Sequence, residues 1–229
     1  MNPYTIQRAR SKVDLAELEG PQRPSPIAGM HNMPLPAFAQ QPLAATRSMN
    51  INAAAAALKI SRASFEKLIA CGMVPTPIDA DLIGLLASRP RLVVTAGELT
   101  VLRTAARSAA HESDRDWIGF DVGFSVVDMT AAALRWWRCD PDRVLDNELF
   151  AVTVATIPVA VYAVTALEDT IQEPGEAETR HRFAGDLLAR WGEPVAQGIA
   201  PRLKERVEQM MSSRISVSSG GPIGYLNAE

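Results

Sequence analysis

Two adjacent stretches of strand-forming residues, 149–155 and 159–167, constrain the fold of this chain most strongly. Both are rich in valine and threonine, and the second also carries Tyr162; these residue types are favoured in β-strands. Pro158 lies between them, so we expect two neighbouring antiparallel strands. The same apolar run is interrupted by Thr153, Thr156 and Pro158 and falls short of the about 20 apolar residues that span a bilayer. The sequence therefore predicts a hairpin here and no membrane partner.

The remainder of the second half predicts further short elements around this hairpin. Ser125 and Asp128 suit the start of a helix running to residue 138, and Pro201 suits the first turn of a helix over 202–211. The segment Asp-Pro-Asp at 140–142 is typical of a turn. An exposed acidic loop is expected over 168–178, and three strands over 180–188, 214–218 and 223–226. The fold class predicted for residues 114–229 is α+β, closing as a small mixed β-barrel with flanking helices.

Helix-capping residues dominate the segment 49–113. Asn52 can cap a helix over 53–58, and Ser61 one running to residue 71, after which Gly72 suits a left-handed position. Asp79 can start a third helix over 80–87, which Pro90 closes. We therefore expect a small all-α domain.

A fourth helix is predicted at the end of this segment. Thr95 and Glu98 match a capping box, which would open a long amphipathic helix reaching residue 112. Leu99, Leu102 and Ala106 would face inward. The apolar stripe of this helix can serve a homodimer or pack inside one monomer, and the sequence leaves both open.

Residues 1–48 form a proline-rich segment in which apolar residues follow neither a helical nor a strand period. Such a composition cannot bury enough surface to offset the entropy of ordering, so we expect a disordered tail. The alternative is a tether or a segment that binds a protein partner.

Charge and cysteine content limit the function classes. The chain has a net charge of −3 and a pI near 5.7, which argues against coating nucleic acid by bulk electrostatics. The segments 1–50 and 51–113 are nevertheless mildly basic, so a local basic surface is expected. Cys71 and Cys139 show no metal-binding or disulfide spacing. The polar, arginine-bearing N-terminus does not resemble a secretory signal, and we expect a cytoplasmic bacterial protein.

The stretch INAAAAALKISRASFEKLIACGMVP, residues 51–75, resembles the helix-turn-helix of excisionase and MerR-type DNA readers. The resemblance implies that the second helix enters the major groove. The side chains expected to contact nucleic acid are Ser61, Arg62, Ser64 and Lys67. Residues 75–81 are acidic and helical where the family carries a basic wing. An ordinary helical hairpin with a solvated outer face is the alternative.

Four segments of the second half resemble the PUA-like superfamily, near its ASCH and EVE-type members: LRWWRCDPDRV, LFAVTVATIPVAVYAV, HRFAGDLL and GGPIGYLN. The resemblance implies a shallow pocket on one barrel face, where relatives commonly bind RNA or flipped modified bases. Arginine and aromatic side chains could stack a base and hold a phosphate there. Arg180 and Arg182 are the expected phosphate contacts, and the expected base pocket comprises Trp136, Trp137, Arg138, Tyr162, Phe183 and Tyr225.

Trp136 and Trp137 are neighbours, so on a helix they would point about 100° apart. One is expected in the core and the other in the pocket. The alternative is that all the aromatic side chains belong to the core.

Signals for catalysis are weak. The sequence contains no HExxH, CxxC, GxSxG or phosphate-binding glycine loop, so no catalytic residue, metal site or cofactor is expected. His181 lies between two arginines, which favours its neutral form in a structural hydrogen-bonding role over that of a general base. Acidic pairs such as Asp140 and Asp142 are interpreted as solvated turns rather than Mg²⁺ sites.

Together these patterns predict a non-catalytic nucleic-acid-binding protein, with a role in transcriptional regulation or phage defence. DNA is favoured over RNA: the helix-turn-helix would contact a duplex while the barrel reads a second feature, such as a base turned out of the stack. The alternatives are a protein-interaction adaptor with a structural barrel, and a hydrolase that processes nucleic acid.

Overall fold

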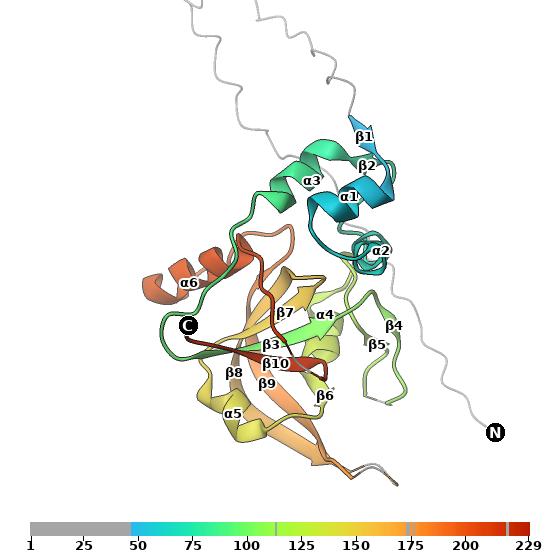
Figure 1. The fold of residues 1–229 in the computed structure, drawn as a ribbon. Coiled ribbons are helices and arrows are strands. Elements are labelled where there is room, and N and C mark those ends of the chain that lie inside the picture. Colours follow the sequence, from blue (N-terminus) through green and yellow to red (C-terminus); the bar gives the residue numbers. More distant parts are fainter. Residues whose placement is uncertain (1–46, 113, 173–174, 176, 219) are drawn as a thin grey trace, which may run out of the picture. The chain divides into compact units, whose positions relative to one another are not determined.

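A six-stranded mixed sheet organises the chain in the computed structural model, which describes residues 47–112, 114–172, 175, 177–218 and 220–229 (Figure 1). Its strands are β3 (Glu98–Thr104), β6 (Arg135–Trp137), β7 (Phe150–Val154), β8 (Ile157–Ile171), β9 (Arg180–Arg190) and β10 (Ile223–Asn227). They lie in the order β10–β3–β7–β8–β9–β6. The β3–β7 pair is parallel, and the other neighbours are antiparallel. The α+β class is confirmed.

The sheet curls into a half-barrel because its longest strands are irregular. The β8–β9 pairing shifts register at three places, and bulges of this kind increase local twist. β10 and β6 remain at the two edges of the strand order, whereas we expected a closed barrel. Residues 168–171 continue β8 instead of beginning the expected acidic loop.

The predicted hairpin over 149–167 is confirmed as β7 and β8. Every residue of β7 is buried, because hydrophobic cores cover both faces of the sheet. Phe150 and Val152 belong to the larger core, and Ala151 belongs to the smaller one. This alternation is what a strand between two packed layers requires.

The described residues form six helices beside the sheet: α1 (Ile51–Ala57), α2 (Arg62–Ala70), α3 (Ala80–Ala87), α4 (Val126–Leu134), α5 (Pro141–Asp146) and α6 (Pro201–Met211). The predicted caps Ser61, Asp79 and Ser125 each accept a hydrogen bond from a backbone N–H of the first helical turn. Gly72 has a φ of 80°, as expected after a helix end. α1 is capped by Asn50 in place of Asn52.

The larger core joins the N-terminal helices to the sheet. Leu58 and Phe65, from the α1–α2 region, lie in the same cluster of buried side chains as Tyr162 and Phe183 of the sheet. On the opposite face, α6 buries Val207 with residues of β3 and β8. The described residues belong to one compact unit, Leu43–Glu229, and residues 1–46 of the expected disordered tail lie outside them.

The prediction of a helix that begins at Thr95 is wrong, because residues Glu98–Thr104 form strand β3. Thr100 and Val101 are β-branched and suit a strand. β10 and β7 satisfy the backbone of β3 from either side, and both come from distant parts of the sequence. Tertiary pairing therefore overrides the local capping pattern.

Three smaller expectations of the second half are also corrected. The helix capped by Ser125 ends at Leu134 and does not reach residue 138, because the two tryptophans belong to strand β6. Asp140 is the N-cap of α5 rather than part of a turn, since its side chain accepts from the Arg143 N–H at 3.2 Å. Residues 214–218 contribute a single bridge at Arg214 instead of a strand.

The described residues also form two pairs of short strands outside this sheet: β1 (Ser48–Met49) with β2 (Ile78–Asp79), and β4 (Ser108–Ala109) with β5 (Trp117–Ile118). In the part of the chain that the structure describes, no helix is both long enough and apolar enough to cross a membrane.

Candidate functional site

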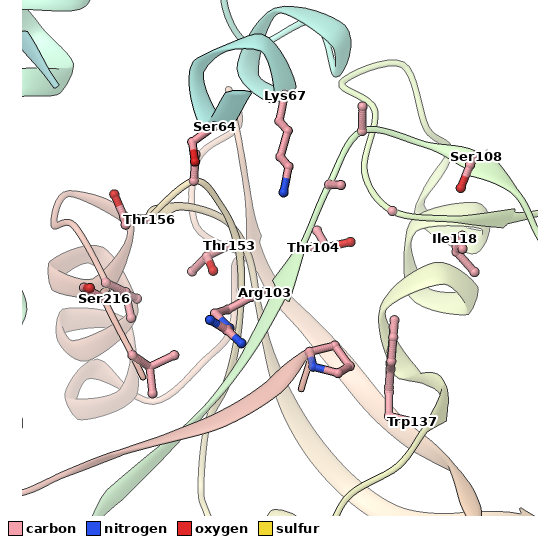
Figure 2. Close-up of a pocket in the computed structure, with 17 residues that line it drawn as sticks. Ser64, Lys67, Arg103, Thr104, Ser108, Ile118, Trp137, Thr153, Thr156 and Ser216 are labelled. Atoms are coloured by element: carbon pink, nitrogen blue, oxygen red, sulfur yellow. The ribbon is translucent and has the colours of Figure 1, made fainter. Parts of the chain in front are cut away.

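A cleft of about 620 Å³ opens beside α2, where the parallel strands β3 and β7 end (Figure 2). Its wall is completed by Trp137 and by the segment 215–217. Six hydroxyl side chains line it: Ser64, Thr104, Ser108, Thr153, Thr156 and Ser216. Such a wall offers hydrogen-bond donors and acceptors to a polar ligand.

Two cations share this cleft. Lys67 extends its amine into the cavity from the last turn of α2, and Arg103 extends its guanidinium from β3 (Figure 2). Among the residues that the structure describes, no Asp or Glu lines the cleft. On a chain with a net charge of −3, this concentrates positive charge at one place.

The packing of α2 against the core determines which of its side chains project into the cleft. Phe65 and Leu68 are fully buried, which anchors one face of the helix in the larger core. Ser64 and Lys67 therefore project beside that face, into the cleft. Arg62, also expected to contact nucleic acid, instead pairs with Glu66 at 2.9 Å and donates to Asn52 at 3.4 Å. Ser61 serves as the exposed cap.

The turn between β7 and β8 forms part of the cleft wall, and its backbone is strained. Ala155 and Thr156 have φ values of 48° and 76°, the left-handed conformation that a two-residue hairpin turn requires but that non-glycine residues adopt at a cost. The Thr156 carbonyl accepts from the Ile215 N–H at 2.9 Å, and its hydroxyl oxygen lies 3.3 Å from a guanidinium nitrogen of Arg214. The segment after α6 thus holds this turn against the cleft.

The two neighbouring tryptophans face different surroundings. Trp136 is 7% exposed and its indole N–H donates to Asp114 at 2.9 Å, whereas Trp137 is half-buried and lines the cleft. The Trp137 indole N–H donates to the Ala133 carbonyl at 2.6 Å, which fixes the ring. The division between a buried and an accessible ring matches our expectation, but it arises from strand alternation in β6 rather than from helical rotation.

Tyr162 and Phe183 are buried in the core and do not reach a ligand. Burial raises the pKa of the Tyr162 hydroxyl to about 12. Their predicted place in a base pocket is therefore wrong, because both side chains are needed to fill the space beneath the curled sheet. Tyr225 is half-buried beneath the guanidinium of Arg143, 3.7 Å from the ring centre.

Arg180 and Arg182 belong to an ion-pair network at the edge of the sheet formed by β9 and β6. Arg180 lies 3.3 Å from Glu112, and Arg182 lies 3.4 Å from Asp114. Burial opposes ionisation of Asp114, but the hydrogen bond from the Trp136 indole and nearby arginine charges outweigh it, so the pKa of this carboxyl is lowered. These ion pairs hold both arginines in place at that edge.

Arg115 lies at the centre of this network and is buried. It binds both carboxylate oxygens of Glu112 and donates to the Arg135 carbonyl. Burial raises the pKa of Glu112, but the hydrogen bonds from Arg115 and from the backbone, together with the charge of Arg115, outweigh that effect and the pKa is lowered overall.

His181 lies apart from the cleft and is buried at 6% exposure. Its Nδ1 is 3.1 Å from the Thr170 hydroxyl and its Nε2 is 3.2 Å from the Thr179 hydroxyl. Both ring nitrogens therefore have structural partners. Within the described ranges, no three His, Cys, Asp or Glu side chains are grouped so that they could hold a metal ion.

Arg103, Thr156 and Ser216 line the cleft, although no sequence motif marks them as site residues. The helix expected after Thr95 would contain Arg103, and the strand expected over 214–218 would contain Ser216. The β-branched composition of Thr100 and Val101 was the one local signal that could have placed Arg103 at a strand end.

Arg138, expected in the base pocket, is exposed just after β6 and lines a smaller cavity beside the cleft together with Trp136, Trp137, Arg180 and Pro222.

Comparison with known proteins adds no relative: no protein-family model, no curated protein and no solved structure matches the chain.

Proposed function

We propose that this protein binds nucleic acid without catalysis and that one nucleotide enters the cleft between α2 and the sheet. The observation that carries the proposal is the joint presence of Lys67, Arg103 and Trp137 in a hydroxyl-rich cavity without a described acidic wall residue. Cations hold phosphate, and an aromatic ring offers a face on which any base can stack. The ligand class is therefore an anion that carries a planar ring.

In this proposal α2 does not contact nucleic acid on its own. The resemblance to a helix-turn-helix implies that α2 reads a major groove by itself, but Ser64 and Lys67 both line the cleft. We therefore place the nucleic-acid contact of α2 in the same site as that of the sheet. A base turned out of a duplex and a base in a single strand both suit such a site.

The resemblance to the PUA-like superfamily remains part of this proposal. A curled mixed sheet with flanking helices is compatible with it, as is a pocket lined by Trp137. Binding is favoured over hydrolysis because, among the described residues, the cleft wall carries no carboxylate, imidazole or thiol to act as a general base.

The test is fluorescence anisotropy of labelled single-stranded and duplex DNA and RNA on the full chain. Affinity should fall steeply between about 50 and 200 mM salt. Lys67→Ala should weaken binding to every sequence and reduce the salt slope by about one. Lys204→Ala, which removes a lysine from α6 outside the cleft, is the matched control and should change affinity little. Absence of binding at low salt, or equal loss in both variants, would contradict the proposal.

A protein-interaction adaptor is the second candidate, and exposed valines favour it. Val126 and Val127 at the start of α4 are 51% and 76% exposed. Adjacent exposed apolar side chains suit a protein contact, whose affinity would respond little to salt. The same salt titration therefore separates the two candidates.

A further inference from the structure

A second cavity of about 170 Å³ adjoins the cleft. Its wall consists of Trp136, Trp137, Arg138, Arg180 and Pro222. Trp137 and Pro222 also line the cleft, so these two side chains form a partition with one cavity on each side. The two cavities are thus neighbouring parts of one surface.

Both cavities are basic. Lys67 and Arg103 lie in the larger one, and Arg138 and Arg180 in the smaller one. No acidic side chain from the described ranges lines either of them. The walls of the two cavities therefore include four cationic side chains, and a guanidinium presents its N–H groups in a fork that matches phosphate oxygens.

The sizes of the cavities differ in a way that suits different parts of one ligand. Small-molecule sites usually have about 300–1,000 Å³, a range that includes the cleft and excludes the second cavity. The smaller space has room for a phosphate group and a few waters. A ring is better placed in the cleft, which is the larger of the two spaces that Trp137 lines.

The partition is held in place from both sides. The Arg103 backbone N–H donates to the Pro222 carbonyl at 2.8 Å, and the Arg103 guanidinium donates to the Gly221 carbonyl. The Trp137 indole is bound to the Ala133 carbonyl. Arg180, paired with Glu112 at 3.3 Å, is likewise fixed beside the second cavity. Little ordering is therefore needed when a ligand crosses the partition, which favours affinity.

We propose that the ligand is a phosphodiester-linked strand rather than a free nucleotide, with one nucleotide in the cleft and the adjoining phosphate beside Arg138 and Arg180. This inference rests on the proposed function and specifies its ligand. The chemistry is shared by DNA and RNA, and the recognised unit is at least a dinucleotide.

The test compares a mononucleotide with the dinucleotide and a longer oligonucleotide of the same base, in deoxy and ribo forms, by calorimetric titration of the full chain. The dinucleotide should bind about tenfold more tightly than the mononucleotide, because a charge-assisted contact is added. Arg138→Ala should abolish that gain. Lys67→Ala should weaken all the ligands.

Arg202→Ala is the matched control, since it removes one exposed arginine from α6 outside both cavities. It should preserve the dinucleotide gain. Equal affinity for mononucleotide and dinucleotide, or a gain that survives Arg138→Ala, would overturn this inference while leaving nucleotide binding in the cleft intact. Failure of every ligand to bind would overturn the proposed function and this inference with it.

Discussion

Lys67 on α2 and Arg103 on β3 project into the same cleft from two elements that β2, α3 and the loops around them separate in the sequence (Figure 2). Their charges meet because α2 packs into the larger core through Phe65 and Leu68, while β3 ends at the cleft. The functional surface is therefore a product of tertiary packing between the helices and the sheet.

Trp137 should contribute its ring face to binding. Replacement with leucine, which keeps apolar volume but removes the ring, should cost about 1–3 kcal/mol of affinity for a strand, and replacement with phenylalanine should recover most of it. Trp191→Leu, at a tryptophan outside the cleft wall, should have little effect. Anisotropy on variants whose circular dichroism matches the wild type measures this, and a leucine variant that binds as tightly as the phenylalanine one would contradict it.

Ala155 lies in a left-handed conformation, so glycine should fit this position better. Ala155→Gly should raise the free energy of unfolding by up to about 1 kcal/mol, because relief of the conformational cost exceeds the entropy lost by glycine. Ala166→Gly, in strand β8, should lower it by about 0.5–1 kcal/mol. Urea denaturation measures both values, and destabilisation by the first substitution would show that the turn is not strained.

Arg115 should be important for stability. Its side chain is 3% exposed, so Arg115→Ala would leave the Glu112 carboxylate and the Arg135 carbonyl without their buried donor. The expected loss is about 3–5 kcal/mol of unfolding free energy. Arg62→Ala, which removes an exposed helix pair, should cost no more than about 0.5 kcal/mol. Similar losses in the two variants would contradict the central place of Arg115 in the network.

Glu98 should make stability depend on acid pH. Its hydrogen bond from Arg143 lowers the pKa of the carboxyl in the folded state. The folded state then binds this proton less readily than the unfolded state. The stabilisation that the ionised Glu98 side chain contributes is complete above the ordinary pKa of about 4.5. It is lost as the pH falls through the lower pKa that this carboxyl has in the folded state.

In the Glu98→Gln variant the free energy of unfolding should therefore decrease less steeply as the pH is lowered below about 4.5. In an Arg143→Gln background the same substitution should have a smaller effect, because the main cause of the shift is already gone. Denaturation series at several pH values measure both slopes. An unchanged acid slope in Glu98→Gln would contradict this account of the carboxyl.

Local signals in the sequence predicted the starts of four helices, α2, α3, α4 and α6. Ser61, Asp79 and Ser125 cap their own helices through bonds to residues two or three positions ahead, and Pro201 occupies a first turn that needs no N–H. The hairpin of β7 and β8 is also local, since the two strands are joined by two residues.

Long-range pairing could not be predicted in the same way. β3 matches a helix-start pattern, and its true partners β7 and β10 lie about 50 and 120 residues further along the chain. Lys67, Ser64 and Trp137 were identified as candidates, but their convergence with Arg103 and Thr156 depends on that pairing. Tyr162 and Phe183 fill the core, which is the alternative that the sequence left open for the aromatic side chains.

The most direct test of the central claim is to map the contact surface by NMR, following backbone amides of the labelled full chain as a short oligonucleotide is added. Binding in the cleft predicts the largest shifts at Lys67, Arg103 and Thr156, with the α6 residues around Lys204 unmoved. Shifts gathered around Val127, or on the outer face of α2 at Arg62 and Glu66, with the cleft amides unchanged, would contradict it.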